Sequence, residues 1–131
     1  MRVLIDTHVF LWFIGEPTRL STGANRIIEF GASTVLISIA SIWEISIKSS
    51  TGKLDVAGGF SAVERVLPEN NIEILPISFL HALANHRLPF HHKDPFDRMN
   101  AAQAIVEGVD LISVDDAFDL YFADTEVKRI W

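Results

Sequence analysis

The chain has 131 residues, of which 49% are hydrophobic and 21% are charged, and it contains no cysteine. This length suits one domain, so we expect residues 1–131 to form a single unit with a sizeable core; the composition excludes intrinsic disorder, and the lack of thiols excludes disulfides and thiolate metal sites. The net charge of −6 argues against binding nucleic acid through a broad basic face.

The apolar content also bears on assembly and location. The mean hydropathy of +0.27 is high for a chain of this size, so we expect both an unusually apolar core and a partner that covers part of the surface. Asp6 and His8 interrupt the apolar start of the chain, and no run approaches the roughly 20 residues that span a membrane. We therefore expect a cytoplasmic protein with no membrane partner.

Short β-branched runs alternate with helical patterns, which is typical of βαβ units in a mainly parallel sheet. We expect strands over 2–5, 34–38, 72–77, 111–114 and 127–130. Between the successive strands we expect helices over 9–14 and 21–30, over 39–50 and 60–67, over 79–86 and 95–107, and one further helix before the last strand. We expect Gly31 to close the helix over 21–30 and Pro68 to end the helix over 60–67. The boundaries of the helix over 95–107 are the clearest, because Asp94 suits the N-cap, Pro95 the first turn and Gly108 the end. The sequence predicts an α/β fold with a sheet of four to five strands.

Three acidic residues fall at the carboxyl edge of this predicted sheet, where open parallel sheets bind ligands. Asp6 directly follows the first strand, and Asp115 directly follows the fourth. Asp97 lies in the first turn of a crossover helix, and the preceding loop is long enough to return it to that edge. Glu44 is the fourth candidate, because a long helical side chain tilts back toward the helix N-terminus.

Four carboxylates without a thiolate favour a hard divalent cation, Mg²⁺ or Mn²⁺ rather than Zn²⁺. One or two such ions would activate a bound water to attack a phosphodiester in line and would stabilise the developing charge. The ions would also offset the negative charge of the cluster, so that an acidic protein could bind phosphate through them. The sequence therefore predicts metal-dependent phosphodiester hydrolysis.

Each carboxylate also has a structural interpretation. Asp6 could cap a helix, and Asp97 could complement a helix dipole. Glu44 and Lys48 are spaced as a surface ion pair worth about 0.2–0.5 kcal/mol. Only the common location of the acids favours a functional site.

Four stretches of the chain carry a family resemblance, namely residues 4–9 with Leu11 and Trp12, residues 38–48 with Gly52-Lys53-Leu54, residues 92–98 with 101–104, and residues 111–115 with Phe118. These stretches resemble the PIN domain family, and within it the branch of VapC-type toxins. They follow one another in the order of the family and together span nearly the whole chain.

The resemblance implies a three-layer α/β/α fold and an Mg²⁺- or Mn²⁺-dependent endoribonuclease that cleaves RNA. It also implies frequent dimers and inhibition by a cognate antitoxin, as for the toxin of a type II toxin–antitoxin pair. It places metal-binding acids at the same four positions, Asp6, Glu44, Asp97 and Asp115. One position departs from the family, which often has Thr two residues before its last acid, where this chain has Ser113 and so keeps the hydroxyl.

Further side chains could support the carboxylates or contact RNA. They are Ser113, Arg98, Asp116, His92, Lys93 and Lys48. Arg98 could instead pair with Asp94 or with an acidic group of the antitoxin, and Asp116 could replace Asp115 as the fourth ligand. The loop residues could equally be solvated only.

Two other classes of protein share parts of this pattern. A phosphoryl-transfer enzyme of the haloacid-dehalogenase type also has an acid after its first strand, but it expects a second Asp where this chain has His8. A receiver-like signalling domain expects paired acids after its first strand, whereas here they occur near the end. A PIN-like scaffold that only binds, without catalysis, is the remaining alternative.

Overall fold

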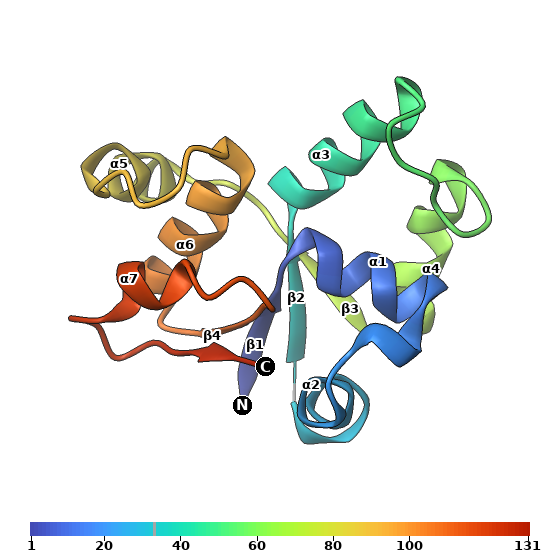
Figure 1. Ribbon diagram of the computed structural model, residues 1–131, viewed down its shortest axis with the longest axis horizontal. Helices are drawn as coiled ribbons and strands as arrows, with labels where there is room; N and C mark the ends of the chain where they lie inside the picture. The colour runs from blue at the N-terminus through green and yellow to red at the C-terminus, as the bar shows by residue number, and fades with distance from the viewer. Residues whose placement is uncertain (33) are drawn as a thin grey trace.

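The computed structural model describes residues 1–32 and 34–131, and Figure 1 shows their arrangement. In this part of the chain, five parallel strands form one sheet in the order β3-β2-β1-β4-β5. The strands are β1 Arg2–Ile5, β2 Thr34–Ser38, β3 Ile72–Leu75, β4 Asp110–Ile112 and β5 Arg129–Ile130. The parallel sheet expected from the sequence is confirmed.

Helices connect successive strands of the sheet. They are α1 Thr7–Gly15, α2 Thr22–Arg26, α3 Ile39–Ser50, α4 Val63–Glu69, α5 Phe79–Arg87, α6 Pro95–Glu107 and α7 Phe118–Phe122, with 3₁₀ turns η1 Pro17–Arg19 and η3 Phe60–Ala62 and a π-helical turn η2 Ile27–Gly31. The predicted bounds of α3 and α6 are confirmed. For α6 the reason is local, since Asp94 accepts the N–H groups of Phe96 and Asp97, and Gly108 adopts the left-handed conformation at the C-terminal end.

The sheet separates two cores, because alternate residues of a strand point to opposite faces. Val3 and Ile5 of β1 pack on one face with α1, α3 and α4, whereas Leu4 packs on the other face with α6 and α7. Figure 1 shows α1 and α4 on one side of the strands and α6 and α7 on the other. The three-layer α/β/α arrangement is therefore confirmed. Among the described residues no helix combines the length and the apolar character that a membrane crossing requires.

The strand order contains a reversal that matters for function. From β1 the chain moves outward through β2 to β3 and then returns to place β4 on the free side of β1. The connections that leave β1 and β4 therefore diverge at the carboxyl edge, which is where open α/β sheets bind ligands. Asp6, directly after β1, donates its N–H to the carbonyl of Ile112, at 3.2 Å, and so stays beside the end of β4.

Several predicted boundaries are wrong. The strand β4 ends at Ile112 rather than at residue 114, because Val114 lies in an exposed turn, so Asp115 does not directly follow the strand. The helix predicted over 21–30 is divided between α2 and the π-helical turn η2, and its cap is Ala32 with ordinary φ rather than Gly31. Helix α4 continues one residue beyond Pro68, which occupies its last turn.

Candidate active site

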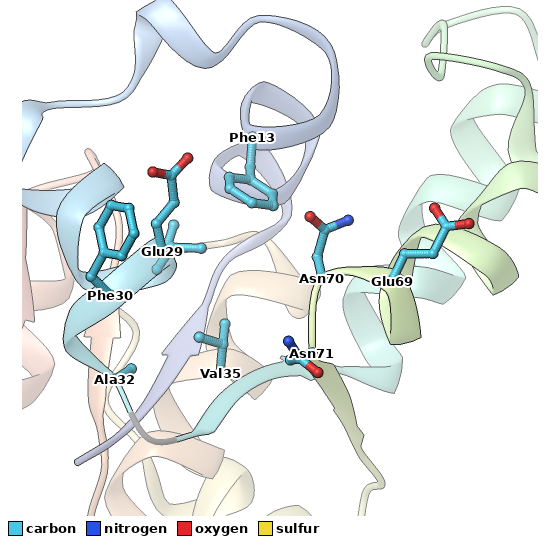
Figure 2. Close-up of a pocket in the computed structure, with 9 residues that line it drawn as sticks. Phe13, Glu29, Phe30, Ala32, Val35, Glu69, Asn70 and Asn71 are labelled. Atoms are coloured by element: carbon cyan, nitrogen blue, oxygen red, sulfur yellow. The ribbon is translucent and has the colours of Figure 1, made fainter.

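The two edges of the sheet differ in character. At the amino edge, a hollow of about 450 Å³ is lined by side chains that include Phe13, Val35 at the start of β2, and Asn71 just before β3 (Figure 2). The predicted acids lie at the opposite edge, beyond the carboxyl ends of β1 and β4. The hollow and the acids therefore lie at opposite edges of the sheet, and the hollow's lining contains none of the four predicted acids.

Asp6 lies at the junction of β1 and α1, where it has a structural role. Its Oδ1 atom accepts the N–H of Val9 at 2.8 Å and so caps α1, as the structural interpretation of the sequence expected. The side chain is buried, and burial raises the pKa of Asp6, with the Asp115 charge adding to the effect. Hydrogen bonds from Ser113 and Val9 oppose the shift. Asp6 can therefore cap α1 with one carboxylate oxygen and still belong to the acidic site.

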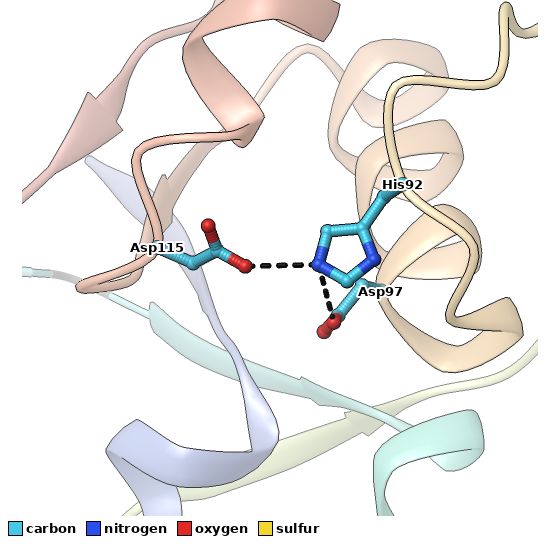
Figure 3. A group of neighbouring side chains, drawn as sticks. All are labelled: His92, Asp97 and Asp115. Atoms are coloured by element: carbon cyan, nitrogen blue, oxygen red, sulfur yellow. Dashed lines mark hydrogen bonds and ion pairs between the residues drawn. The ribbon is translucent and has the colours of Figure 1, made fainter.

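Asp97 and Asp115 both face the same nitrogen of one imidazole ring (Figure 3). The Nε2 atom of His92 lies 2.9 Å from Oδ2 of Asp115 and 3.2 Å from Oδ2 of Asp97. Candidate ligand atoms of these three residues all lie within 4.8 Å of one another, and among the described residues this is the group close enough to hold one metal ion. The loop after β4 and the first turn of α6 therefore converge, as the chain lengths predicted for Asp97.

The electrostatics of Asp97 connect three of the four predicted acids, Asp97 itself, Asp6 and Glu44. Burial raises the pKa of Asp97 to about 7, and the negative charges of Asp94, Asp6 and Glu44 add to this, while His92 opposes it. The raised pKa means that the charged form of Asp97 is poorly stabilised, first because the side chain is buried and second because other negative charges lie near it. A bound cation would offset these charges, so the site fits a divalent metal ion in charge as well as in donor type.

Ser113 connects two of the acids. Its buried Oγ accepts the N–H of Asp115 at 3.0 Å, and the side chain also hydrogen-bonds to Asp6. The turn that carries Asp115 is held by Arg129 as well, because Nη1 donates to the Ser113 carbonyl at 3.1 Å while the rest of the guanidinium pairs with Asp119. Sequence reasoning missed Arg129, since nothing in the pattern linked the last strand to this turn.

Glu44 is buried and fully engaged. Lys48 Nζ lies 2.5 Å from Oε2, and the hydroxyl of Thr7 donates to Oε1 at 2.6 Å. The ion pair that the spacing suggested is formed, but its acidic member is buried rather than on the surface. Thr7 was not among the predicted residues, although a hydroxyl directly after Asp6 was a signal that could have identified it.

Arg98 does not point toward the acids. Its buried guanidinium donates to the carbonyl oxygens of Asn85, Leu88 and Pro89 at 2.8–3.3 Å and to the hydroxyl of Tyr121. One helical step from Asp97 rotates the side chain by about 100°, which directs it to α5 and the following loop. The suggested contacts of Arg98 with RNA or with an antitoxin are therefore wrong, as is the suggested pair with Asp94.

The two remaining candidates are exposed. Asp116 lies next to Asp115, but the oxygen that faces His92 and Asp97 belongs to Asp115, which favours Asp115 as the ligand. Lys93 follows His92 on the loop before α6 and faces solvent, where a phosphate could reach it.

The sequence of the chain matches a known family along most of its length. The family model for the PIN domain matches residues 3–122. The chain belongs to the PIN domain family. One curated relative of this PIN-domain chain is ribonuclease VapC22 of Mycobacterium tuberculosis, which is 31% identical over 116 residues, or 86% of each chain. Membership of this family leaves the haloacid-dehalogenase and receiver alternatives without support.

Solved structures share the PIN fold at lower identity. A chain of VapBC2 from Rickettsia felis, bound to a DNA fragment from its promoter, aligns with a TM-score of 0.75 and 18% identity over 98% of each chain. VapC20 of M. tuberculosis, described as a sarcin–ricin loop cleaving toxin, aligns with a TM-score of 0.67 and 15% identity over 95% of this chain and 98% of its own. At such identities the likeness establishes the fold.

Proposed function

We propose that residues 1–131 act as a single endoribonuclease domain that uses a divalent metal ion, with Asp6, Glu44, Asp97 and Asp115 as its carboxylates. The observation that carries this proposal is the convergence of Asp97 and Asp115 on one point at the carboxyl edge of the sheet. The relative VapC22, similar over 86% of both chains, is a ribonuclease, which supports RNA as the substrate.

The ion that we propose is Mg²⁺ or Mn²⁺. The converging carboxylates offer oxygen ligands, which suit these hard cations, and the chain has no cysteine. When bound, such an ion supplies a more acidic water and a positive charge beside the phosphate.

The other tasks of the proposed reaction are binding the metal ion, positioning its ligands and binding the phosphate, and different residues would perform each of them. Asp97 and Asp115 would hold the ion, because their oxygens face a common point. Asp6 adds a buried charge beside them, and Ser113 fixes its position relative to Asp115. The half-exposed ammonium of Lys48, held by Glu44, lies where it can bind a non-bridging oxygen of the phosphodiester. Exposed Lys93 could bind a neighbouring phosphate of the RNA.

We further propose that the chain is the toxin of a toxin–antitoxin pair and acts in the cytoplasm. The solved structures of similar fold include VapBC complexes and a structure from Klebsiella pneumoniae described as a toxin–antitoxin complex. Large apolar side chains are exposed on α3 and α5, namely Trp43, Phe79 and Leu80, and a protein partner would cover such a surface. A second copy of this chain, in a homodimer, would cover part of it in the same way.

The proposed activity is tested by cleavage of a mixed RNA pool by purified, antitoxin-free protein in Mg²⁺ or Mn²⁺ and in EDTA. Asp115→Asn and Asp116→Asn form a matched pair, because the residues are neighbours and only the first faces Asp97. We expect metal-dependent cleavage by the wild type and by Asp116→Asn, and none by Asp115→Asn. Absence of cleavage by the metal-loaded wild type across varied RNA would favour the binding-only scaffold.

A further inference from the structure

His92 occupies a position within the carboxylate site that the proposed reaction does not explain. Its Nε2 atom lies within hydrogen-bonding distance of Oδ2 of both Asp97 and Asp115 (Figure 3). By distance alone the imidazole could be a third metal ligand, with the two carboxylates as the others. The hydrogen bond on the opposite side of the ring shows whether Nε2 can be a metal ligand or is instead a hydrogen-bond donor to the two carboxylates.

The opposite nitrogen of the ring is an acceptor. The backbone N–H of Asp94 points to Nδ1 of His92 at 3.2 Å, so Nδ1 carries no proton in this arrangement. A neutral imidazole has one N–H, which must therefore be on Nε2. Nε2–H then donates to the carboxylates of Asp97 and Asp115. The imidazole faces the site with a proton, where a metal ligand would present a lone pair.

Coordination through Nε2 would require a different tautomer. The proton would have to move to Nδ1, where it would oppose the N–H of Asp94, which is fixed because the Asp94 side chain caps α6. The backbone around His92 is also held, since its own N–H donates to the hydroxyl of Tyr121 at 2.8 Å. The side chain remains about one-quarter exposed and can rotate away from the acids while this backbone stays in place.

We propose that His92 occupies the metal position when no cation is bound, by donating its Nε2–H to Asp97 and Asp115, and that it has to leave this position for a cation to bind, without becoming a ligand of that cation. Its N–H lies between the two carboxylates, where it offsets their repulsion. An ion that binds both acids takes over this role. The inference rests on the proposed metal site but not on RNA being the substrate.

The test is a calorimetric titration of the full chain with Mn²⁺, without RNA. It compares the wild type with His92→Ala and with His91→Ala, a matched control because His91 is on the same loop and packs its ring against Tyr121, away from the acids. We expect His92→Ala to bind Mn²⁺ roughly threefold to tenfold more tightly than the wild type, on the scale of one net hydrogen bond that the ion no longer has to break. We expect His91→Ala to match the wild type.

A second measurement does not depend on any substitution. The nitrogen NMR signals of the His92 ring should show the proton on Nε2 in EDTA, and after addition of Mg²⁺ that proton should remain on Nε2 and exchange faster with solvent. Transfer of the proton to Nδ1 on addition of Mg²⁺ would show coordination and overturn the proposal.

The titration separates two kinds of failure. Wild-type binding with an equal or lower affinity in His92→Ala would overturn the role of His92 and leave the metal site standing. Absence of binding by the wild type would overturn both. Asp97→Asn should bind Mn²⁺ far more weakly in either background, which assigns the measured heat to this site.

Discussion

Lys48 and Glu44 form an ion pair in which the ammonium reaches solvent and the carboxylate does not. The Nζ and Oε2 atoms are 2.5 Å apart, and the side chains are 38% and 4% exposed. Breaking a pair with a buried member leaves an uncompensated charge, whereas a fully exposed pair contributes little. The pair therefore stabilises the position of Glu44 at the edge of the acidic site.

The first prediction concerns this pair. Replacing Lys48 by Met should lower the free energy of unfolding in EDTA by about 1–2 kcal/mol, a value reduced from that of a fully buried pair because Lys48 is partly exposed. The loss should shrink in saturating Mg²⁺, because a cation near Glu44 offsets the same charge. Urea unfolding measures both values, with Lys53→Met as a control on the exposed turn after α3. Equal losses for the two variants would contradict this account.

The second prediction is the pH dependence of stability in EDTA. The pKa of Asp97 is raised from 3.8 to about 7 in the folded protein, so the folded state binds more protons than the unfolded state between these values. The stability that this group contributes is fully present below about pH 4 and is lost as pH rises through about 7. The wild type should therefore be less stable at pH 8 than at pH 5.5. Urea unfolding should show a smaller difference for Asp97→Asn, and an unchanged difference would contradict the shift.

Protons and cations should compete for the same carboxylate. The Mg²⁺ affinity of the wild type, measured by calorimetry, should fall as the pH is lowered below about 7. This fall is opposite in direction to the gain in stability, which distinguishes competition at Asp97 from general acid unfolding.

The third prediction concerns Arg98. Replacing this buried side chain by Ala would remove the donors that satisfy the carbonyl groups of Asn85, Leu88 and Pro89. We expect a loss of at least about 3 kcal/mol in unfolding free energy, since hydrogen bonds to charged groups are each worth roughly 1.5–3 kcal/mol net and water can replace some of the lost donors. Arg87→Ala, at an exposed position, should change stability by less than about 0.5 kcal/mol. Chemical denaturation of both variants measures the difference, and a near-neutral Arg98→Ala would contradict the structural role.

The fourth prediction concerns Ser113. Loss of its hydroxyl removes the hydrogen bonds to the N–H of Asp115 and to Asp6. Side chains that orient metal ligands typically affect metal affinity by roughly 10- to 100-fold, so Ser113→Ala should bind Mn²⁺ at least about tenfold more weakly. Calorimetry measures the affinity, and thermal unfolding confirms that the variant folds. An unchanged affinity in a folded variant would show that the turn after β4 is held without Ser113.

The sequence predicted best where local chemistry determines structure. The bounds of α6 follow from Asp94, Pro95 and Gly108, and its place at the carboxyl edge follows from the crossover rule for parallel strands. The end of β4 was harder, because Ser113 and Val114 suit a strand in type, but they leave the sheet for a turn held by Arg129.

Side chains outside regular elements were the least predictable part of the site. His92 is in the loop before α6, and no periodic pattern determines where a loop side chain points. Its position between Asp97 and Asp115 depends on a local hydrogen bond from the N–H of Asp94 and on a tertiary hydrogen bond to the hydroxyl of Tyr121. Arg98 illustrates the converse, because proximity to Asp97 in sequence does not place two helical side chains on one face.

Asp97 and Asp115 are the proposed ligands of the metal ion on which RNA cleavage would depend. The most direct measurement is the rate of RNA cleavage in Mg²⁺ for the wild type, Asp97→Asn and the exposed control Asp124→Asn. We expect a loss of about 100-fold or more for Asp97→Asn, wild-type rates for Asp124→Asn, and no cleavage in EDTA. Cleavage by Asp97→Asn at the wild-type rate, or cleavage that persists in EDTA, would contradict this proposal.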